Sequence, residues 1–187
     1  MSVVKVGLKT REVTASAVFA VLTCVGAWAS IRLPITPVPI TLQVFFVLLS
    51  GAVLGGRLGA LSQVMYILLG ISGLPVFAGG TSGPGVLVGP TGGYLFGFIA
   101  GAYVTGWVGH SFSPTSFRKL ILATLLGLCP IYFMGVIWLW FWLKSTPMSV
   151  LIAGILPLLP GDIIKAVISA YVASRKQVMQ IIHHNAL

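Results

Sequence analysis

Asp162 and Lys165 are the two residues whose types and spacing point most directly to chemistry. They lie three positions apart in an otherwise apolar segment, so that a helix would carry both on one face. Burying a charge inside a membrane span costs several kcal/mol, which makes ionisable residues there candidates for function. The pair offers one acceptor and one cationic donor, which suits a ligand with ring N–H and C=O groups or a carboxylate. The alternative is an ion pair that only neutralises itself, although such a pair is often no more stabilising than two apolar residues.

Pro160 and Gly161 stand immediately before Asp162. Both residues disfavour a continuous helix, so we expect the segment to break there and to present the N-terminus of a half-helix to the protein interior. Backbone N–H groups at such an end bind anions and polar groups. The helix end and the charged pair together predict a site for a small polar ligand.

Further polar candidates lie beside breaks in the apolar segments or within them. They are Thr41 and Gln43 after a proline-rich stretch, Gln63 and Tyr66 inside an apolar segment, and Tyr94 after a glycine-rich stretch. Each residue alone is typical of a hydrogen bond between helices, and a ligand contact is the alternative.

Small residues form a stripe on the first apolar segment. Ser16, Ala20 and Cys24 recur at every fourth position, with Ala17 beside them. Small side chains let another helix approach closely. We interpret the stripe as a docking surface for a separate subunit, and packing against a span of the same chain is the alternative. Cys24 and Cys129 lie far apart without a CxxC pattern, which indicates ordinary interior residues.

Several classes of activity lack the residues that they need. The sequence contains no GxxxxGK[ST] pattern to cradle nucleotide phosphates. The three histidines lie at the end of an apolar segment or in the C-terminal tail, so that an intramembrane hydrolase would lack a base. One interior carboxylate cannot build a carboxylate pair or a metal site. We therefore expect binding and translocation, no enzyme activity, and neither metal nor cofactor.

The elements that position these residues must be membrane helices. The chain of 187 residues is 57% hydrophobic and only 7% charged, with a mean hydropathy of +1.06. One soluble core could not bury so much apolar surface, and open strands cannot span lipid. The sequence predicts an all-α integral membrane protein with six transmembrane helices in a single domain, residues 1–187. The apolar segments are about 13–31, 40–55, 58–74, 90–109, 120–143 and 149–174, of which the second and third are short for a crossing.

The positions of the cations behind the net charge of +9 indicate the orientation of the chain in the membrane and not nucleic-acid binding. Eight of the 11 Lys and Arg residues precede the first segment, follow the last, or lie in the second-to-third and fourth-to-fifth connections. Arg32 and Lys144 lie on the other side, and Lys165 is inside a span. The positive-inside rule then predicts an even number of spans with both termini in the cytoplasm.

Two connections on the expected outer side are unusual. Residues 32–39 contain three prolines, which predicts a stiff, extended segment. Residues 73–93 contain eight glycines and three prolines but no charge, and they join the third span to the fourth. Long loops in compact domains are usually functional, and the apolar residues of this one argue for a folded lid or a re-entrant segment.

Four blocks at these positions resemble a known family. They are Val38-Pro39-Ile40-Thr41-Leu42-Gln43, Gly73-Leu74-Pro75-Val76-Phe77-Ala78-Gly79-Gly80, Gly89-Pro90-Thr91-Gly92-Gly93-Tyr94-Leu95 and Leu159-Pro160-Gly161-Asp162-Ile163-Ile164-Lys165-Ala166. Over roughly residues 10–175 the chain resembles the BioY family, the biotin-specific S components of energy-coupling factor (ECF) transporters. The resemblance implies an S-component fold of six helices in the cytoplasmic (inner) membrane of a prokaryote, with biotin held near the outer face.

The resemblance also implies partners and site residues. A transmembrane coupling protein, driven by two ATPase subunits, would dock on the small residues of the first helix. Asp162 and Lys165 match polar substrate contacts, and the segment 77–80 and Tyr94 would line the pocket. Some members carry an amide side chain where this chain has Ala78-Gly79-Gly80, so the polar contacts to the ligand ring shift to backbone groups here. We expect the substrate-binding set to be Thr41, Gln43, Phe77, Gly79, Gly80, Tyr94, Asp162 and Lys165.

Two alternatives stay open from the sequence. A biotin facilitator that works without an ATPase would have the same residues as a subunit of an ECF transporter. A membrane enzyme or assembly factor would use Asp162 as its catalytic group, although one carboxylate without an interior histidine supports little acid–base chemistry.

Overall fold

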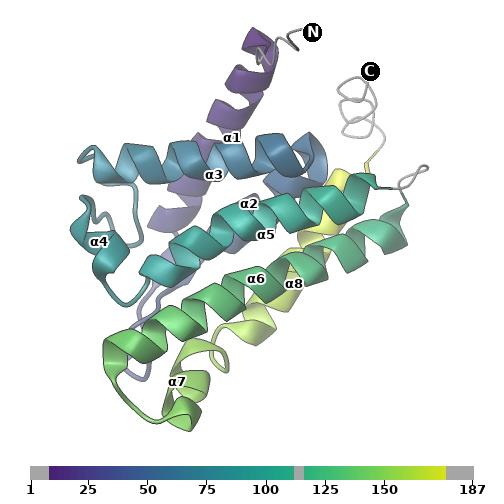
Figure 1. Cartoon of the computed structure of the whole chain (residues 1–187). Coiled ribbons are helices and arrows are strands. Elements are labelled where there is room, and N and C mark those ends of the chain that lie inside the picture. The colour runs from purple at the N-terminus through teal and green to yellow at the C-terminus, as the bar shows by residue number, and fades with distance from the viewer. Residues whose placement is uncertain (1–8, 112–115, 176–187) are drawn as a thin grey trace, which may run out of the picture.

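The computed structural model describes residues 9–111 and 116–175. Its elements are α1 (Thr10–Trp28), β1 (Ser30–Ile31), β2 (Ile40–Thr41), α2 (Gln43–Leu54), α3 (Gly56–Ile71), α4 (Gly85–Val88), α5 (Gly92–His110), α6 (Phe117–Leu143), α7 (Pro147–Gly154) and α8 (Leu159–Ala173). Figure 1 shows α4 and α7 at one end of the bundle, whereas α6 begins and α8 ends at the other. The connections with most of the prolines and glycines are thus gathered at the first of these two ends.

The observed helices follow five of the six predicted segments closely, and the sixth is divided. Residues 149–174 form α7 and α8, which are bent by 46° at their junction. The predicted break exists, but it lies at residues 155–158 and not at Pro160. Pro160 instead stands in the first turn of α8, where a missing N–H costs nothing because that N–H would have no partner in the helix.

The lengths of the helices bear on how the chain meets the bilayer. By length and composition, α1 and α6 can each cross a membrane, and α7 with α8 counted as one bent span makes a third. The helices α2 and α3 are apolar but have only 12 and 16 residues. The prediction that the second and third segments are short is confirmed, and the total of six spans stays a prediction.

The proline-rich segment folds back on itself, so the prediction of an extended stretch over 32–39 is wrong. Strands β1 and β2 pair in antiparallel register, with Ser30 opposite Thr41. Between them the N–H of Thr36 donates to the carbonyl of Leu33 at 3.3 Å, which closes a turn. Prolines fit this hairpin because they stand in its turn and not in the paired strands.

The glycine-rich connection is folded, as the sequence predicts. Phe77 is only 1% exposed, and its N–H donates to the carbonyl of Thr81 at 3.0 Å. Gly79 and Gly80 have φ values of +72° and +74°, which side chains disfavour. A side chain at Gly70 would overlap the Phe77 ring, since its Cβ would come within 2.4 Å of the ring's Cε atoms. The loop is therefore anchored on the end of α3 by a buried aromatic ring.

Glycines also set the packing below the loops, between α5 and α6. A Cβ on Gly97 would lie 2.8 Å from the Cα of Ile131. One turn deeper, a Cβ on Gly127 would lie 2.9 Å from Leu48 and would overlap the Thr105 hydroxyl. The helices thus touch through their backbones, which leaves no room for even a methyl group at these points.

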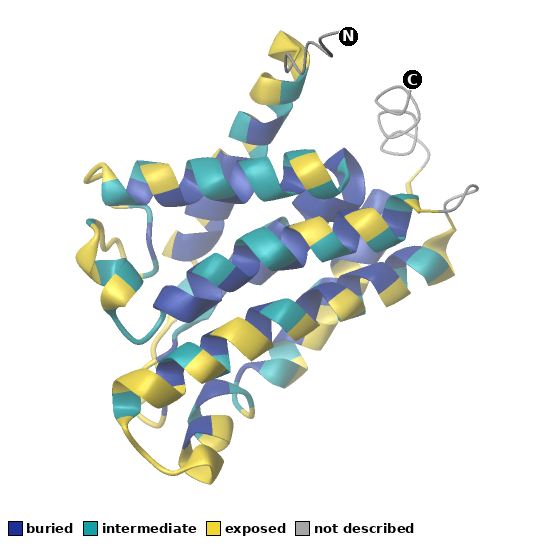
Figure 2. Cartoon of the chain, in the orientation of Figure 1, coloured by how far each residue is buried: buried dark blue, intermediate teal, exposed yellow. Residues whose placement is uncertain are grey.

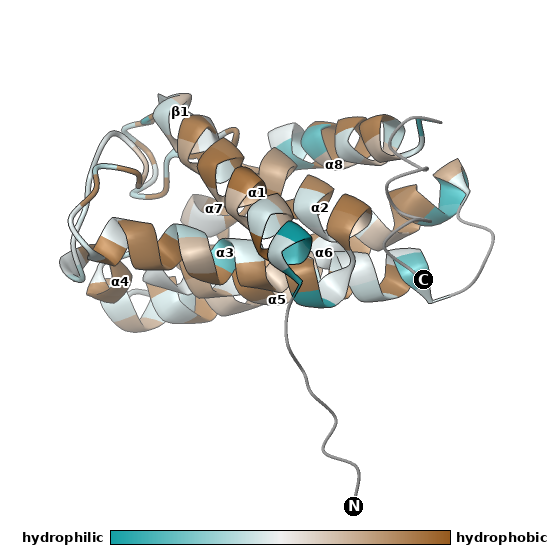
Figure 3. Ribbon diagram, turned by 90° about the horizontal axis from the view of Figure 1, so that it is seen from above, coloured by the Kyte–Doolittle hydropathy of each residue, from teal (hydrophilic) through white to brown (hydrophobic). Residues whose placement is uncertain are grey.

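Large apolar side chains cover the outward surfaces of the helices. Figure 2 shows exposed positions along α6, and Figure 3 shows hydrophobic residues, in brown, along the helices. Exposed residues of this kind include Val18, Val21 and Val25 on α1, Phe133, Ile137 and Phe141 on α6, and Ile164 and Ile168 on α8. A surface of this composition requires lipid around it, in agreement with the predicted membrane location.

The stripe of small residues on α1 faces the interior. Ser16 and Ala20 are at most 1% exposed and Cys24 is 8% exposed, whereas Ala17 is half-buried. The Ser16 hydroxyl donates to the carbonyl of Leu58 on α3 at 3.2 Å. Packing within the chain accounts for these side chains, and the docking role predicted for them stays a prediction.

Candidate functional site

A cavity of about 360 Å³ lies among the hairpin, the glycine-rich loop, the beginnings of α2, α5 and α8, and the middle of α6. This volume is in the range of small-molecule sites. Most of its lining is apolar, and the polar side chains that line it are Arg32, Thr36, Thr41, Gln43, Thr81, Thr91, Tyr94 and Asp162. One enclosed carboxylate among apolar walls is an arrangement that orients a ligand by a few polar contacts.

Asp162 is the most strongly held polar group of the cavity. The residue is 5% exposed, and its two carboxylate oxygens have different partners. The Lys165 ammonium donates to Oδ1 at 2.8 Å, and the Tyr132 hydroxyl donates to Oδ2 at 2.7 Å. Each carboxylate oxygen has a further lone pair, so that Asp162 can still accept an N–H from a ligand.

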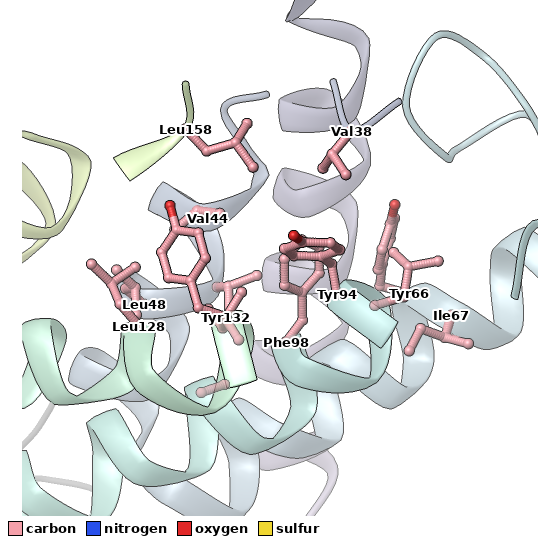
Figure 4. Packing of buried hydrophobic residues seen from close by; sticks show 14 of the residues in the cluster. Val38, Val44, Leu48, Tyr66, Ile67, Tyr94, Phe98, Leu128, Tyr132 and Leu158 are labelled. Atoms are coloured by element: carbon pink, nitrogen blue, oxygen red, sulfur yellow. The ribbon is translucent and has the colours of Figure 1, made fainter. Parts of the chain in front are cut away.

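Tyr94 forms the wall next to this carboxylate. Its hydroxyl donates to the carbonyl of Gly154 at 2.8 Å, which connects α5 to the C-terminal end of α7. Its ring meets that of Tyr132 edge to face, with centroids 6.5 Å apart. Figure 4 shows the hydroxyl groups of Tyr66, Tyr94 and Tyr132 pointing to the same side of the core. Because the Tyr94 hydroxyl is already bonded, this residue presents mainly an aromatic surface to a ligand.

Gln43 and Phe77 form another part of the wall. The Gln43 amide donates to the Tyr66 hydroxyl at 2.5 Å, and that hydroxyl donates to the carbonyl of Val76 at 3.2 Å. The ring of Phe77 stands perpendicular to the ring of Tyr66, with centroids 5.6 Å apart. The Thr41 hydroxyl accepts the N–H of Gln43, the first residue of α2, at 3.3 Å. These bonds fix the wall and leave the carbonyl oxygen of Gln43 to a ligand.

The structure brings five of the eight predicted substrate-binding residues to the cavity. Thr41, Gln43, Phe77, Tyr94 and Asp162 line it, whereas Lys165, Gly79 and Gly80 do not. Lys165 reaches the site through Asp162, and the two glycines shape the loop that carries Phe77. Direct ligand contact by these last three residues therefore stays a prediction.

Two residues of the site were missed by sequence reasoning. Tyr132 holds Asp162 from 30 positions away, and Arg32 lines the cavity from the hairpin. Tyr132 could have been singled out as a polar side chain in a long apolar segment. In the sequence, Arg32 indicates only a charge on the outer side of the membrane.

The cavity offers side chains that can bind a small molecule. Among residues 9–111 and 116–175, no group of three His, Cys, Asp or Glu side chains could hold a metal ion. The cavity is lined by one carboxylate, one guanidinium, one amide side chain, several hydroxyls and aromatic rings, which together suit a compact ring with polar edges.

The BioY family model matches residues 1–181. The chain belongs to the BioY family. A protein named biotin transporter BioY from Thermotoga maritima is 44% identical to it over 171 residues, which are 91% of this chain and 98% of that protein. A probable biotin transporter BioY from Pyrococcus horikoshii is 41% identical over 170 residues, with the same coverage of 91% and 98%.

A solved structure has the same fold as this BioY chain. It is the S component for biotin from an ECF-type ABC transporter, and it superposes with a TM-score of 0.82 at 26% sequence identity. The match covers 94% of each chain. The predicted S-component-like, all-α fold is confirmed, and with it the resemblance noted in the sequence.

Proposed function

We propose that this chain captures biotin in the cavity beside Asp162 and delivers it as the S component of an ECF transporter. The observation that carries the proposal is the position of Asp162. It is a buried carboxylate on the cavity wall of a chain whose fold matches an S component for biotin. BioY proteins are transport components, so the alternative of a membrane enzyme or assembly factor is set aside.

The polar edge of biotin fits the polar end of the cavity. Biotin carries a ureido ring with two N–H groups and one carbonyl, fused to an apolar sulfur ring. Asp162 accepts a ureido N–H, and a charge-assisted bond of this kind is about twice as strong as a neutral one. Phe77 and Tyr94 enclose the apolar ring, and the Gln43 amide, held by Tyr66, adds a polar contact.

Lys165 and Tyr132 act on the ligand through Asp162. Their two bonds, of 2.8 and 2.7 Å, fix the carboxylate in rotation. A carboxylate that is held in place loses less conformational entropy when it binds a ligand. Both residues are therefore positioning residues, and Asp162 makes the contact.

The chain works with partners and lipid. Two ATPase subunits supply the energy through a transmembrane coupling protein, which docks on the small residues of α1, Ser16, Ala17, Ala20 and Cys24. The chain crosses the inner membrane of a prokaryote six times with both termini in the cytoplasm. Arg57, Arg118 and Arg175 support this orientation, since each stands at the end of the bundle away from the cavity. Lys5 and Lys176, which also favour it, lie outside the described residues.

Calorimetry of the detergent-purified chain against biotin, thiamine and riboflavin tests the binding step. We expect a single tight site for biotin and no heat from the other two vitamins. Tight binding of thiamine or riboflavin without biotin would overturn the assignment. Uptake into vesicles with and without the coupling protein and ATPases separates the ECF subunit from a facilitator that works alone, because only the subunit needs ATP.

A further inference from the structure

Arg32 stands at the mouth of the cavity, where the hairpin meets the glycine-rich loop. The residue is exposed and it lines the cavity. Its guanidinium lies directly against Gly79, since a Cβ at that position would come within 2.5 Å of the Arg32 Nη2. Gly79 also has a φ of +72°. Any side chain at position 79 would therefore strain the loop and push the guanidinium aside.

Among residues 9–111 and 116–175, neither acidic side chain forms an ion pair with Arg32. The sequence contains two acidic residues, Glu12 and Asp162. Asp162 is occupied by Lys165 and Tyr132. The carboxylate of Glu12 accepts the N–H of Lys9 at 2.7 Å, at the beginning of α1, whereas Arg32 follows the end of that helix. An arginine that lines a cavity without a counter-charge is available to a ligand.

We propose that Arg32 binds the carboxylate of the ligand, and that the site selects vitamins with an anionic tail. The inference rests on the proposed function and adds a second polar contact, at the other end of the ligand. Asp162 holds the neutral polar ring, and Arg32 holds the negative charge at the mouth. A guanidinium is suited to this role, because its planar fork can donate two parallel hydrogen bonds to a carboxylate.

The position of the guanidinium strengthens the contact. Contact with the Gly79 backbone limits the orientations that the side chain samples, so less freedom is lost when the ligand binds. The site then needs no cation on the loop itself, where Ala78, Gly79 and Gly80 offer none. Selectivity for charge resides in the hairpin, and the loop contributes the space that the guanidinium occupies.

The test compares biotin with biotinamide, in which a neutral amide replaces the carboxylate. Calorimetry is done on the full chain in lipid nanodiscs, for the wild type, Arg32→Gln and Arg32→Lys. We expect the wild type to bind biotin up to about fivefold more tightly than biotinamide, since an ion pair that is exposed to solvent contributes at most about that much. Arg32→Gln should lose this preference while its affinity for biotinamide stays unchanged. Arg32→Lys should keep part of it.

A matched control removes the same charge elsewhere. Arg57→Gln, at the opposite end of α3 from the glycine-rich loop, should leave the preference for biotin intact. The preference of the wild type should also fall as salt is raised, because the Arg32 contact is exposed to solvent.

Three results would overturn the inference. The first is a preference for biotin that survives in Arg32→Gln, and the second is an equal loss of biotin and biotinamide in that variant. The third is a wild type that does not bind biotin, which removes the proposed function and this inference with it. The first two results leave the proposed function standing, so the two failures are distinguishable.

Discussion

Substituting Asp162 and Lys165, singly and together, tests whether Lys165 contacts the ligand or only positions Asp162. The side chains are 7% and 14% exposed and 2.8 Å apart, so that solvent screens their interaction weakly. Asp162→Asn keeps the shape of the side chain but removes its charge. A hydrogen bond to a charged group contributes about 1.5–3 kcal/mol. At about 1.4 kcal/mol per tenfold, biotin should bind about 10- to 100-fold more weakly to this variant.

Lys165→Met removes the ammonium and keeps an apolar chain of similar length. Since Lys165 does not line the cavity, this change should weaken binding only by releasing Asp162, by about tenfold. When Asp162 is already Asn, the same change should add less than about twofold. The two changes are then non-additive by about 1 kcal/mol or more, as expected for residues that act as one unit.

Calorimetry with biotin on the wild type, both single variants and the double variant measures this cycle. Thermal unfolding of the same four proteins is the control for folding. Breaking a buried ion pair on one side costs about 3–5 kcal/mol, and removing both charges should restore part of that loss. A Lys165→Met effect of the same size in both backgrounds would refute the reasoning, because it would mean that the ammonium contacts biotin directly.

Three further results are expected. Gly135→Ala should lower the free energy of unfolding by about 1–3 kcal/mol, because the added Cβ would lie 2.4 Å from the Tyr94 ring. The control is Gly85→Ala, whose Cβ would have nothing within 4 Å and which should leave the melting temperature nearly unchanged. Trp138→Phe should speed the dissociation of biotin in a stopped-flow chase, because it removes the 2.9 Å bond from the indole N–H to the Gly89 carbonyl that anchors the loop over the cavity; an unchanged rate would show that this anchor is not needed. Tags on both termini should resist an added protease in right-side-out vesicles and be cut in inverted ones, and cleavage of one tag in each would contradict an even number of spans.

The sequence predicts the parts of the fold that depend on local composition. Apolar runs locate the helices to within a few residues, and glycines mark the folded connection after α3. Pro160 and Gly161 predict that the last segment is broken, but the break lies at residues 155–158. A proline is compatible with the first turn of a helix, so its presence gives the neighbourhood of a break and not its position.

The remaining parts depend on contacts between distant residues, which composition does not encode. Three prolines in 32–39 indicate a rigid stretch, whereas the pairing of β1 with β2 turns that stretch into a hairpin. The bond from Tyr132 to Asp162 joins α6 to α8. Likewise, the contact of Arg32 with Gly79 requires two loops that come together only in the folded chain. The site residues that follow helix breaks could be predicted from the sequence. Those that reach the site through a contact between distant elements, such as Tyr132 and Arg32, could not.

The close packing beneath the cavity decides by which route a ligand can leave. Val44 and Ile131 line the cavity, and one turn deeper Leu48, Thr105 and Gly127 fill the space so completely that a single methyl group would not fit. The cavity is therefore bordered by the loops and closed at its base by packed side chains. A ligand that enters between the loops must leave between them unless the helices that close the base move apart. Uptake measured with and without the coupling protein and the ATPase subunits tests whether ATP drives that movement.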